Sequence, residues 1–150
     1  MPQPQIVMQW LRGRGALLGE PASLGRIARA AAECRAMLGL SLPDGARQWL
    51  ALANGLNWNG LSLFPAEGWR HGPVHLPGLV EVNHRRRFAQ ALPSWLILGE
   101  WDDEWLVHDE GIGSYAVVER STMMVFDRHR SLTEMVRDSA VRGLASGGMP

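Results

Sequence analysis

The sequence contains no lysine, and all 15 of its basic residues are arginines. Genomic base composition is the simplest cause of this bias, and composition of this kind says little about function. The absence still excludes three kinds of site. A phosphate-binding loop of the Walker type, a Schiff base and a Ser-Lys dyad each require a lysine side chain.

Cysteine and long apolar segments are also scarce. With one cysteine, Cys34, the chain cannot form an internal disulfide, which is typical of proteins from a reducing compartment. No segment approaches the roughly 20 apolar residues of a membrane-spanning helix, and the first residues lack the basic start and apolar run of a signal peptide. The net charge is zero, so no overall field attracts nucleic acid or an anionic membrane. We therefore expect a cytoplasmic protein that binds no membrane.

The chain of 150 residues has an ordinary globular composition, with 46% hydrophobic and 20% charged residues. We expect one domain, residues 1–150, in which residues 1–38 form an N-terminal helical region and residues 39–140 the remaining core. Apolar residues recur at helical spacing from Leu24 to Leu38. Ser23 is the expected N-cap of this helix, and Gly39 is expected to end it.

The segment Ser41 to Phe64 has the clearest local pattern in the chain. Pro43 suits the first position of a helix, and Asp44 in the first turn favours the helix dipole. The expected apolar face of this helix consists of Ala46, Trp49, Leu50 and Ala53. Asn54-Gly55 is expected to end the helix, because glycine accepts a positive φ. Asn59-Gly60 then predicts a turn before a strand over residues 61–64.

Two segments follow before the strand-rich part of the chain. Pro65 to Pro77 contains glycines, prolines and polar residues, and it predicts a loop. Leu79 to Leu92 predicts a helix that carries three consecutive arginines, residues 85–87. Asn83 in this helix is expected to be structural and to hydrogen-bond the backbone of a neighbouring loop.

Short strands and a final helix follow residue 94. Trp95 to Trp101 and Trp105 to Asp109 flank an acidic run, which predicts a β-hairpin. Two more strands are predicted over residues 115–119 and 123–126. A last helix begins with a capping box formed by Ser131 and Glu134. Its glycine-rich end, from Gly143, is expected to fray. The expected fold is α+β: an antiparallel or mixed sheet flanked by N-terminal, middle and C-terminal helices.

Leu42-Pro43, Trp49-Leu50 and Asn54-Gly55, in this order, resemble the entry segment of the SUKH superfamily, the Smi/Knr-like fold. Further segments resemble the YrhA-like branch of that superfamily: residues 58–61, 79–83, 96–100, 115–118 and 126–135. The resemblance covers residues 39–140. Many bacterial SUKH proteins are immunity proteins that bind and neutralise polymorphic toxins, often nucleases, and others are regulatory adaptors, as in fungal cell-wall signalling. The resemblance thus implies a binding protein that performs no catalysis and carries no cofactor.

An acidic segment is the strongest candidate for a binding surface. Six carboxylates fall within eleven positions, with no arginine among them: Glu100, Asp102, Asp103, Glu104, Asp109 and Glu110. Trp101 and Trp105 flank the tip of the hairpin, and tryptophan is a frequent interface anchor. One interpretation is a partner-facing acidic ridge that binds the basic surface of a nuclease. The other is a solvated hairpin whose tryptophans lie in the core.

Other candidate chemistry is weaker. His108 and Asp109 are adjacent on a strand and point to opposite faces, while His71 and His75 lack the spacing of a metal site, so we predict no metal centre. Cys34 lies on an apolar stripe, where a thiol is inert. The arginines of residues 85–87 are more typical of a solvated helix face than of a nucleic-acid site.

The leading hypothesis from the sequence is a cytoplasmic immunity protein that docks on a cognate toxin domain and blocks access to its substrate. The alternative is an intracellular adaptor that binds a protein or peptide, which would present a groove. A third class is an enzyme, a hydrolase using His108 and nearby acids. The seven tryptophans are compatible with a homodimer interface as well as with a filled core.

Overall fold

The computed structural model describes residues 2–89 and 94–146. The helices are α1 (Pro4–Gly13), α2 (Leu24–Glu33), α3 (Asp44–Leu52), α4 (Leu79–Ala89) and α5 (Leu132–Ser146), and a π-helical segment, Cys34–Leu38, continues α2. The strands are β1 (Leu17–Leu18), β2 (Leu56–Trp58), β3 (Leu61–Leu63), β4 (Trp69–His71), β5 (Val74–Leu76), β6 (Trp95–Trp101), β7 (Glu104–Asp109), β8 (Ser114–Glu119) and β9 (Val125–His129).

Seven of these strands form one sheet in the order β1-β2-β3-β6-β7-β8-β9, and β4 and β5 form a separate hairpin. Every pair of neighbouring strands is antiparallel. The expected α+β class is confirmed, and the sheet is antiparallel throughout its described pairs rather than mixed. The strands β6 to β9 follow one another in space as they do in sequence, so short turns connect them.

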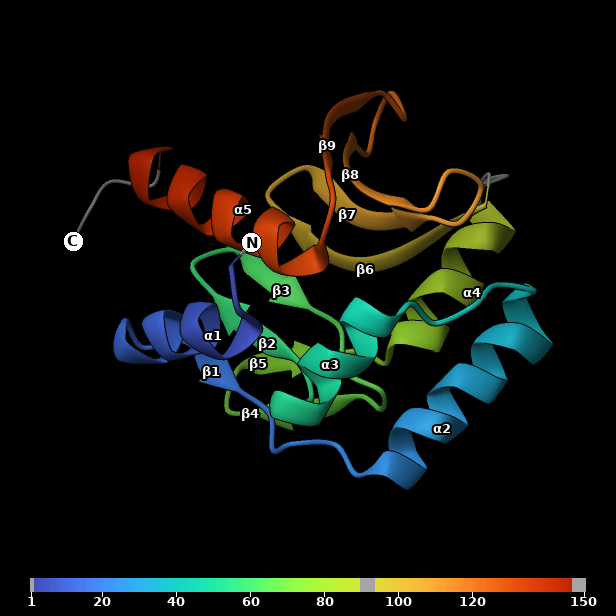
Figure 1. The fold of residues 1–150 in the computed structure, drawn as a ribbon, viewed down its shortest axis with the longest axis horizontal. Coiled ribbons are helices and arrows are strands. Elements are labelled where there is room, and N and C mark those ends of the chain that lie inside the picture. The colour runs from blue at the N-terminus through green and yellow to red at the C-terminus, as the bar shows by residue number, and fades with distance from the viewer. Residues whose placement is uncertain (1, 90–93, 147–150) are drawn as a thin grey trace.

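The helices lie at several sides of this sheet (Figure 1). α2 and α4 lie side by side at one end of the molecule, and α4 also packs on β6. α5 runs beside β9 and contacts β3, β8, α1 and α3. Inside the core, Trp49 of α3 donates a hydrogen bond from Nε1 to Thr133 Oγ1 of α5 over 2.9 Å. One continuous hydrophobic core joins the N-terminal helices to the C-terminal strands.

The N-terminal region is largely as expected. Ser23 accepts a hydrogen bond from the Arg26 N–H, and Gly39 ends the helical segment with a φ of 69°. Leu24 was expected on the apolar face but is 83% exposed, because α2 begins at this residue and its buried positions start at Ile27. The short strand β1, which pairs with β2, was not expected in this region.

The helix α3 begins and ends one or two residues away from the prediction. Pro43 is the N-cap, with an extended backbone, so it precedes the helix rather than occupying its first position. The helix ends at Leu52, and its C-cap Ala53 is extended, so Asn54-Gly55 follows the stop instead of forming it. The second Asn-Gly prediction is confirmed. Asn59 (φ 49°) and Gly60 (φ 85°) form the two-residue turn between β2 and β3.

The predicted loop over residues 65–77 is wrong in its second half. Trp69 pairs with Leu76 and His71 with Val74, so residues 69–76 form the hairpin β4–β5. Gly72, with a φ of 58°, makes the tight turn of this hairpin. The glycine and proline content of this segment therefore marks a turn between two strands and not a continuous loop.

The C-terminal half differs from the prediction in three places. α4 is described to Ala89, and the predicted end at Leu92 lies outside the described residues. β9 begins at Val125, because Met123 has a φ of 63° and belongs to the preceding turn. α5 continues through Gly143 to Ser146, and Gly143 lies so close to β6 that a Cβ there would be 3.1 Å from Trp101 Nε1. The helix therefore does not end at Gly143, and the remaining residues of the predicted frayed tail, Gly147, Gly148 and Pro150, lie outside the described residues.

Candidate functional site

The candidate binding surface lies where β6 turns into β7. Trp101 pairs with Glu104, so Asp102 and Asp103 form a two-residue turn. Asp102 has a φ of 56°, a conformation that aspartate tolerates better than most residues. Both turn residues are exposed, and the side chain of Asp103 is 89% exposed.

Arg120, in the turn after β8, fastens this turn. Its backbone N–H donates to the Asp103 carbonyl over 3.0 Å, and its Nη2 donates to the Asp102 carbonyl over 2.7 Å. Its Nη1 lies 3.2 Å from Glu100 Oε2. One arginine thus holds the β6–β7 turn against the β8–β9 turn, and both turns lie at the same end of the sheet.

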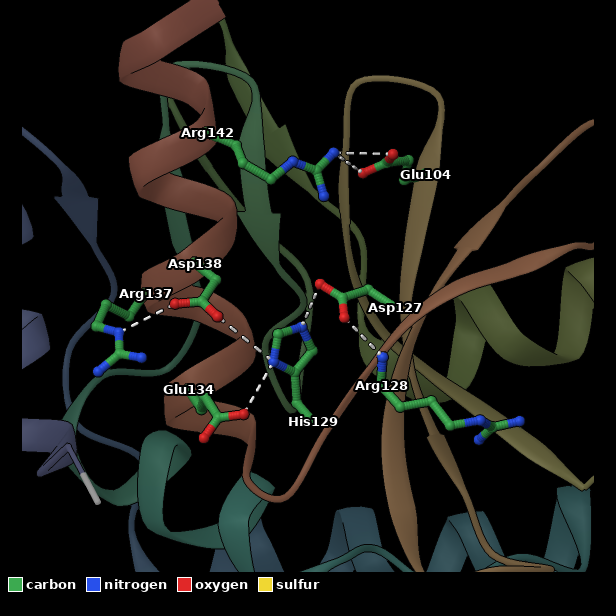
Figure 2. A network of polar contacts seen from close by, with 8 residues as sticks. All are labelled: Glu104, Asp127, Arg128, His129, Glu134, Arg137, Asp138 and Arg142. Atoms are coloured by element: carbon green, nitrogen blue, oxygen red, sulfur yellow. Dashed lines mark hydrogen bonds and ion pairs between the residues drawn. The ribbon is translucent and has the colours of Figure 1, made fainter.

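Arg142 of α5 secures the other side of the hairpin end (Figure 2). Its Nη2 lies 2.8 Å and 2.9 Å from the two carboxylate oxygens of Glu104. Its guanidinium carbon lies 4.6 Å from the ring centre of Trp101 and 5.0 Å from that of Phe126, so it contacts both aromatic rings. Burial raises the pKa of Glu104, and the bond to Arg142 opposes that shift.

The six predicted carboxylates do not form one ridge. Asp109 is the last residue of β7, about 17 Å along the strand from Glu104 at a rise of about 3.4 Å per residue, and Glu110 follows it. Asp109 Oδ2 lies 3.7 Å from Arg128 Nη1. Glu110 accepts a hydrogen bond from the Ser41 N–H over 2.8 Å, and this contact holds its pKa below the ordinary value.

Arginines from distant segments compensate about half of this acidic charge. No arginine lies among the acids in sequence, but Arg120, Arg128 and Arg142 reach Glu100, Asp109 and Glu104 in space. The two flanking tryptophans also differ. Trp105 is 2% exposed and belongs to the core, whereas Trp101 is half-buried beside Arg142. Of the eight predicted binding residues, Trp101, Asp102 and Asp103 are those placed best for a partner.

Exposed apolar side chains complete this end of the molecule. Met124 is 65% exposed and Phe126 is 50% exposed. The Met124 carbonyl accepts a hydrogen bond from the Glu119 N–H, and Glu119 pairs with Glu104 in the sheet. Phe126 contacts Arg142. We call Trp101, Asp102, Asp103, Met124 and Phe126 the hairpin-end surface. The sequence analysis placed Met124 and Phe126 in a strand over residues 123–126 and made no prediction that their side chains are exposed.

A second concave feature lies near the β4–β5 hairpin. A surface groove of about 560 Å³ has Arg26, Glu67, Trp69 and His71 among its lining residues. Arg26 and Glu67 form an ion pair over 3.4 Å at this groove. Trp69 Nε1 donates to the Asn54 carbonyl over 2.6 Å, so the indole is fixed against the chain behind it.

The two asparagines that we expected to be structural are buried and hydrogen-bonded. Asn54 Oδ1 accepts from the Ala66 N–H over 2.7 Å, so it joins the end of α3 to the segment after β3. Asn83 is fully buried, and its amide binds the N–H and the C=O of Ile97. The partner of Asn83 is therefore strand β6 and not a loop.

The candidate enzyme residues lie as follows. Nδ1 of His108 is buried without a hydrogen-bond partner among the described residues, and the ring lies 4.9 Å from that of Tyr115. Burial lowers the pKa of His108. Asp109 comes next on the strand and faces Arg128. The Cys34 thiol is buried, and burial raises its pKa to about 11.

One cluster was missed altogether. His129, Glu134 and Asp138 bring three potential ligand atoms within 4.8 Å of one another. In the sequence, the signal was a histidine two residues before the N-cap Ser131, followed by acids spaced four apart.

A separate finding concerns the membrane: within the described ranges, the helices are too short or too polar to cross a bilayer.

Comparison of the sequence with known proteins assigns no family to the chain. No protein-family model matches the chain. No curated protein matches it either.

Proposed function

We propose that this protein is a non-catalytic binding protein of the immunity type, which neutralises a toxin domain by covering its active surface. The observation that carries the proposal is the hairpin-end surface. It combines two exposed carboxylates, on a turn that Arg120 and Arg142 hold in place, with two exposed apolar side chains, Met124 before β9 and Phe126 on β9. The SUKH-like motifs of residues 39–140 point to the same class of function.

The chemistry of this surface suits a basic partner. Nucleases bind the phosphate backbone and therefore carry arginine and lysine around their active sites. Asp102 and Asp103 can attract such a surface, while Phe126 and Met124 supply apolar area that becomes buried on docking. Because Arg120 and Arg142 already hold the turns, little chain entropy is lost on binding. A standard interface buries about 800 Å² on each partner, which a domain of this size can provide.

The test is binding and protection with the toxin domain encoded beside this gene. We expect Asp102→Asn with Asp103→Arg to weaken binding and to abolish protection, because the double change shifts the local charge by +3. Asparagine at position 102 keeps a residue that tolerates the positive φ of this turn. The matched control is Glu20→Gln with Glu33→Arg, which makes the same charge change on exposed residues elsewhere.

The outcomes separate clearly. Loss of affinity in the hairpin-end variant alone supports the proposal. Equal affinity in all three proteins removes the hairpin-end surface from the interface, and failure to bind any neighbouring toxin removes the immunity function itself.

A specific observation also favours a second candidate, an adaptor that binds a peptide. The groove beside Trp69 has an aromatic wall and charged residues of both signs, Arg26 and Glu67. If this groove is the binding site, the Glu20→Gln, Glu33→Arg protein should lose affinity for the partner instead, because Glu20 also lines the groove. The same pair of variants therefore distinguishes the two candidate functions.

A further inference from the structure

His129, the last residue of β9, is surrounded by carboxylates (Figure 2). Its side chain is 3% exposed. Nε2 lies 3.3 Å from Asp127 Oδ2, while Nδ1 lies 3.1 Å from Glu134 Oε1 and 3.6 Å from Asp138 Oδ2. Glu134 and Asp138 stand four residues apart on α5, so they project from one face of the helix.

This arrangement offers a place for a cation. A neutral imidazole has one N–H, and donation from Nε2 to Asp127 leaves the Nδ1 lone pair facing two carboxylate oxygens. The two carboxylates that face this lone pair repel each other and the lone pair, and a cation placed among them would relieve that repulsion. Arg137 meets only one of them, since its Nε lies 3.1 Å from Asp138 Oδ1, the oxygen turned away from the histidine.

The geometry is close to that of a metal site. Bonds of about 2.1 Å in a tetrahedral site place two ligand atoms about 3.4 Å apart, and the two Nδ1–oxygen distances are 3.1 Å and 3.6 Å. Asp127 Oδ2 is placed to accept a hydrogen bond from Nε2–H, which would orient a ligating imidazole and fix its tautomer. The side chains of Glu134 and Asp138 are 27% and 41% exposed, so an ion and its waters can enter from solvent.

We propose that His129 Nδ1, Glu134 and Asp138 bind a divalent transition-metal ion, with Zn²⁺ bound more tightly than Mn²⁺. One imidazole and two carboxylates suit such ions, whereas Mg²⁺ and Ca²⁺ prefer sites built entirely from oxygen. The bound ion would connect the end of β9 to the first two turns of α5. It would thereby hold the strand that carries Phe126 against the helix that carries Arg142.

The experiment uses untagged full-length protein freed of metal with a chelator and titrated with Zn²⁺ by calorimetry. We expect one Zn²⁺ per chain with micromolar or tighter affinity. Glu134→Gln with Asp138→Asn removes two ligands at partly exposed positions and should weaken binding by more than about 100-fold. Asp127→Asn, which removes only the orienting carboxylate, should weaken it by about 10- to 100-fold.

The controls address other histidines and nonspecific attraction to acids. His75→Gln and Asp103→Asn should leave the affinity unchanged, because both residues lie outside the cluster. Co²⁺ provides an independent readout, since its visible absorption on binding should disappear in the Glu134→Gln, Asp138→Asn protein. Absence of Zn²⁺ binding, or binding that survives the loss of both carboxylates, overturns the proposal.

Discussion

Asn83 offers a sharp test of the packing between α4 and the sheet. It is fully buried, and its amide makes three hydrogen bonds to backbone groups. Nδ2 donates to the carbonyls of Leu79 (2.9 Å) and Ile97 (2.8 Å), and Oδ1 accepts from the Ile97 N–H (2.7 Å). β3 pairs with β6 only at residues 99–101, so the Asn83 amide continues the hydrogen bonding of β6 beyond the end of β3.

Asn83→Leu keeps the size of the side chain and removes these bonds. The Ile97 N–H and C=O then lose their partner in the interior, and each unpaired group costs about 1–3 kcal/mol. The Leu79 carbonyl lies at the start of α4 and keeps its helical partner. Burial of the leucine side chain offsets part of the loss. We therefore expect the free energy of unfolding to fall by about 2–4 kcal/mol, a large share of the roughly 5–15 kcal/mol of a typical domain.

The assay is urea unfolding followed by tryptophan fluorescence, together with hydrogen exchange at the Ile97 amide. Ser139→Ala is the matched control, because Ser139 is 1% exposed and its hydroxyl has no partner among the described residues. Removal of an unpaired hydroxyl should leave stability unchanged or raise it. A loss below about 1 kcal/mol in Asn83→Leu, or slow exchange at Ile97 in that variant, would refute this reasoning.

Two further predictions concern Tyr115 and His108. A Cβ at Gly45 would lie 2.7 Å from the Tyr115 hydroxyl, so Gly45→Ala should lower stability by about 1–3 kcal/mol in urea unfolding. In a Tyr115→Phe background the same change should be neutral or stabilising, because alanine favours the helix, and an equal loss in both backgrounds contradicts the steric cause. Burial lowers the pKa of His108 from 6.5 in the folded protein. As the pH falls below 6.5, His108 is therefore protonated more readily in the unfolded chain than in the folded chain. Stability should therefore fall with acidification below that pH, and His108→Phe should reduce this slope between pH 6.5 and 5; identical slopes in both proteins would contradict the assignment.

The parts of the fold that depend on neighbouring residues were predictable. Ser23 and Ser131 cap their helices and Asn59-Gly60 forms its turn, because each uses only residues within three positions. The β4–β5 hairpin was missed, since its short strands lie among glycines and prolines that also suit a loop. A cap can be read locally, but the length of a strand depends on the partner that pairs with it.

The candidate sites were predictable only in part, because their chemistry joins distant segments. The acids of the β6–β7 turn were visible, but Arg120 and Arg142 reach them from 20 and 38 residues away. Asn83 was recognised as structural, whereas its partner Ile97 lies on an element whose position the sequence does not reveal. The cluster at His129 required knowing that β9 ends beside the first turns of α5.

The order of the strands has a consequence for how this protein associates with others. Its sheet ends at β1, only two residues long, and at β9, which carries Asp127 and Arg128 with side chains 48% and 46% exposed. Very short edge strands and exposed charges on an edge both discourage another chain from adding a strand. The fold therefore resists polymerisation through its backbone. A specific partner is expected to recognise side chains instead. Substitutions at the binding surface can then alter the choice of partner without exposing a strand edge that favours aggregation.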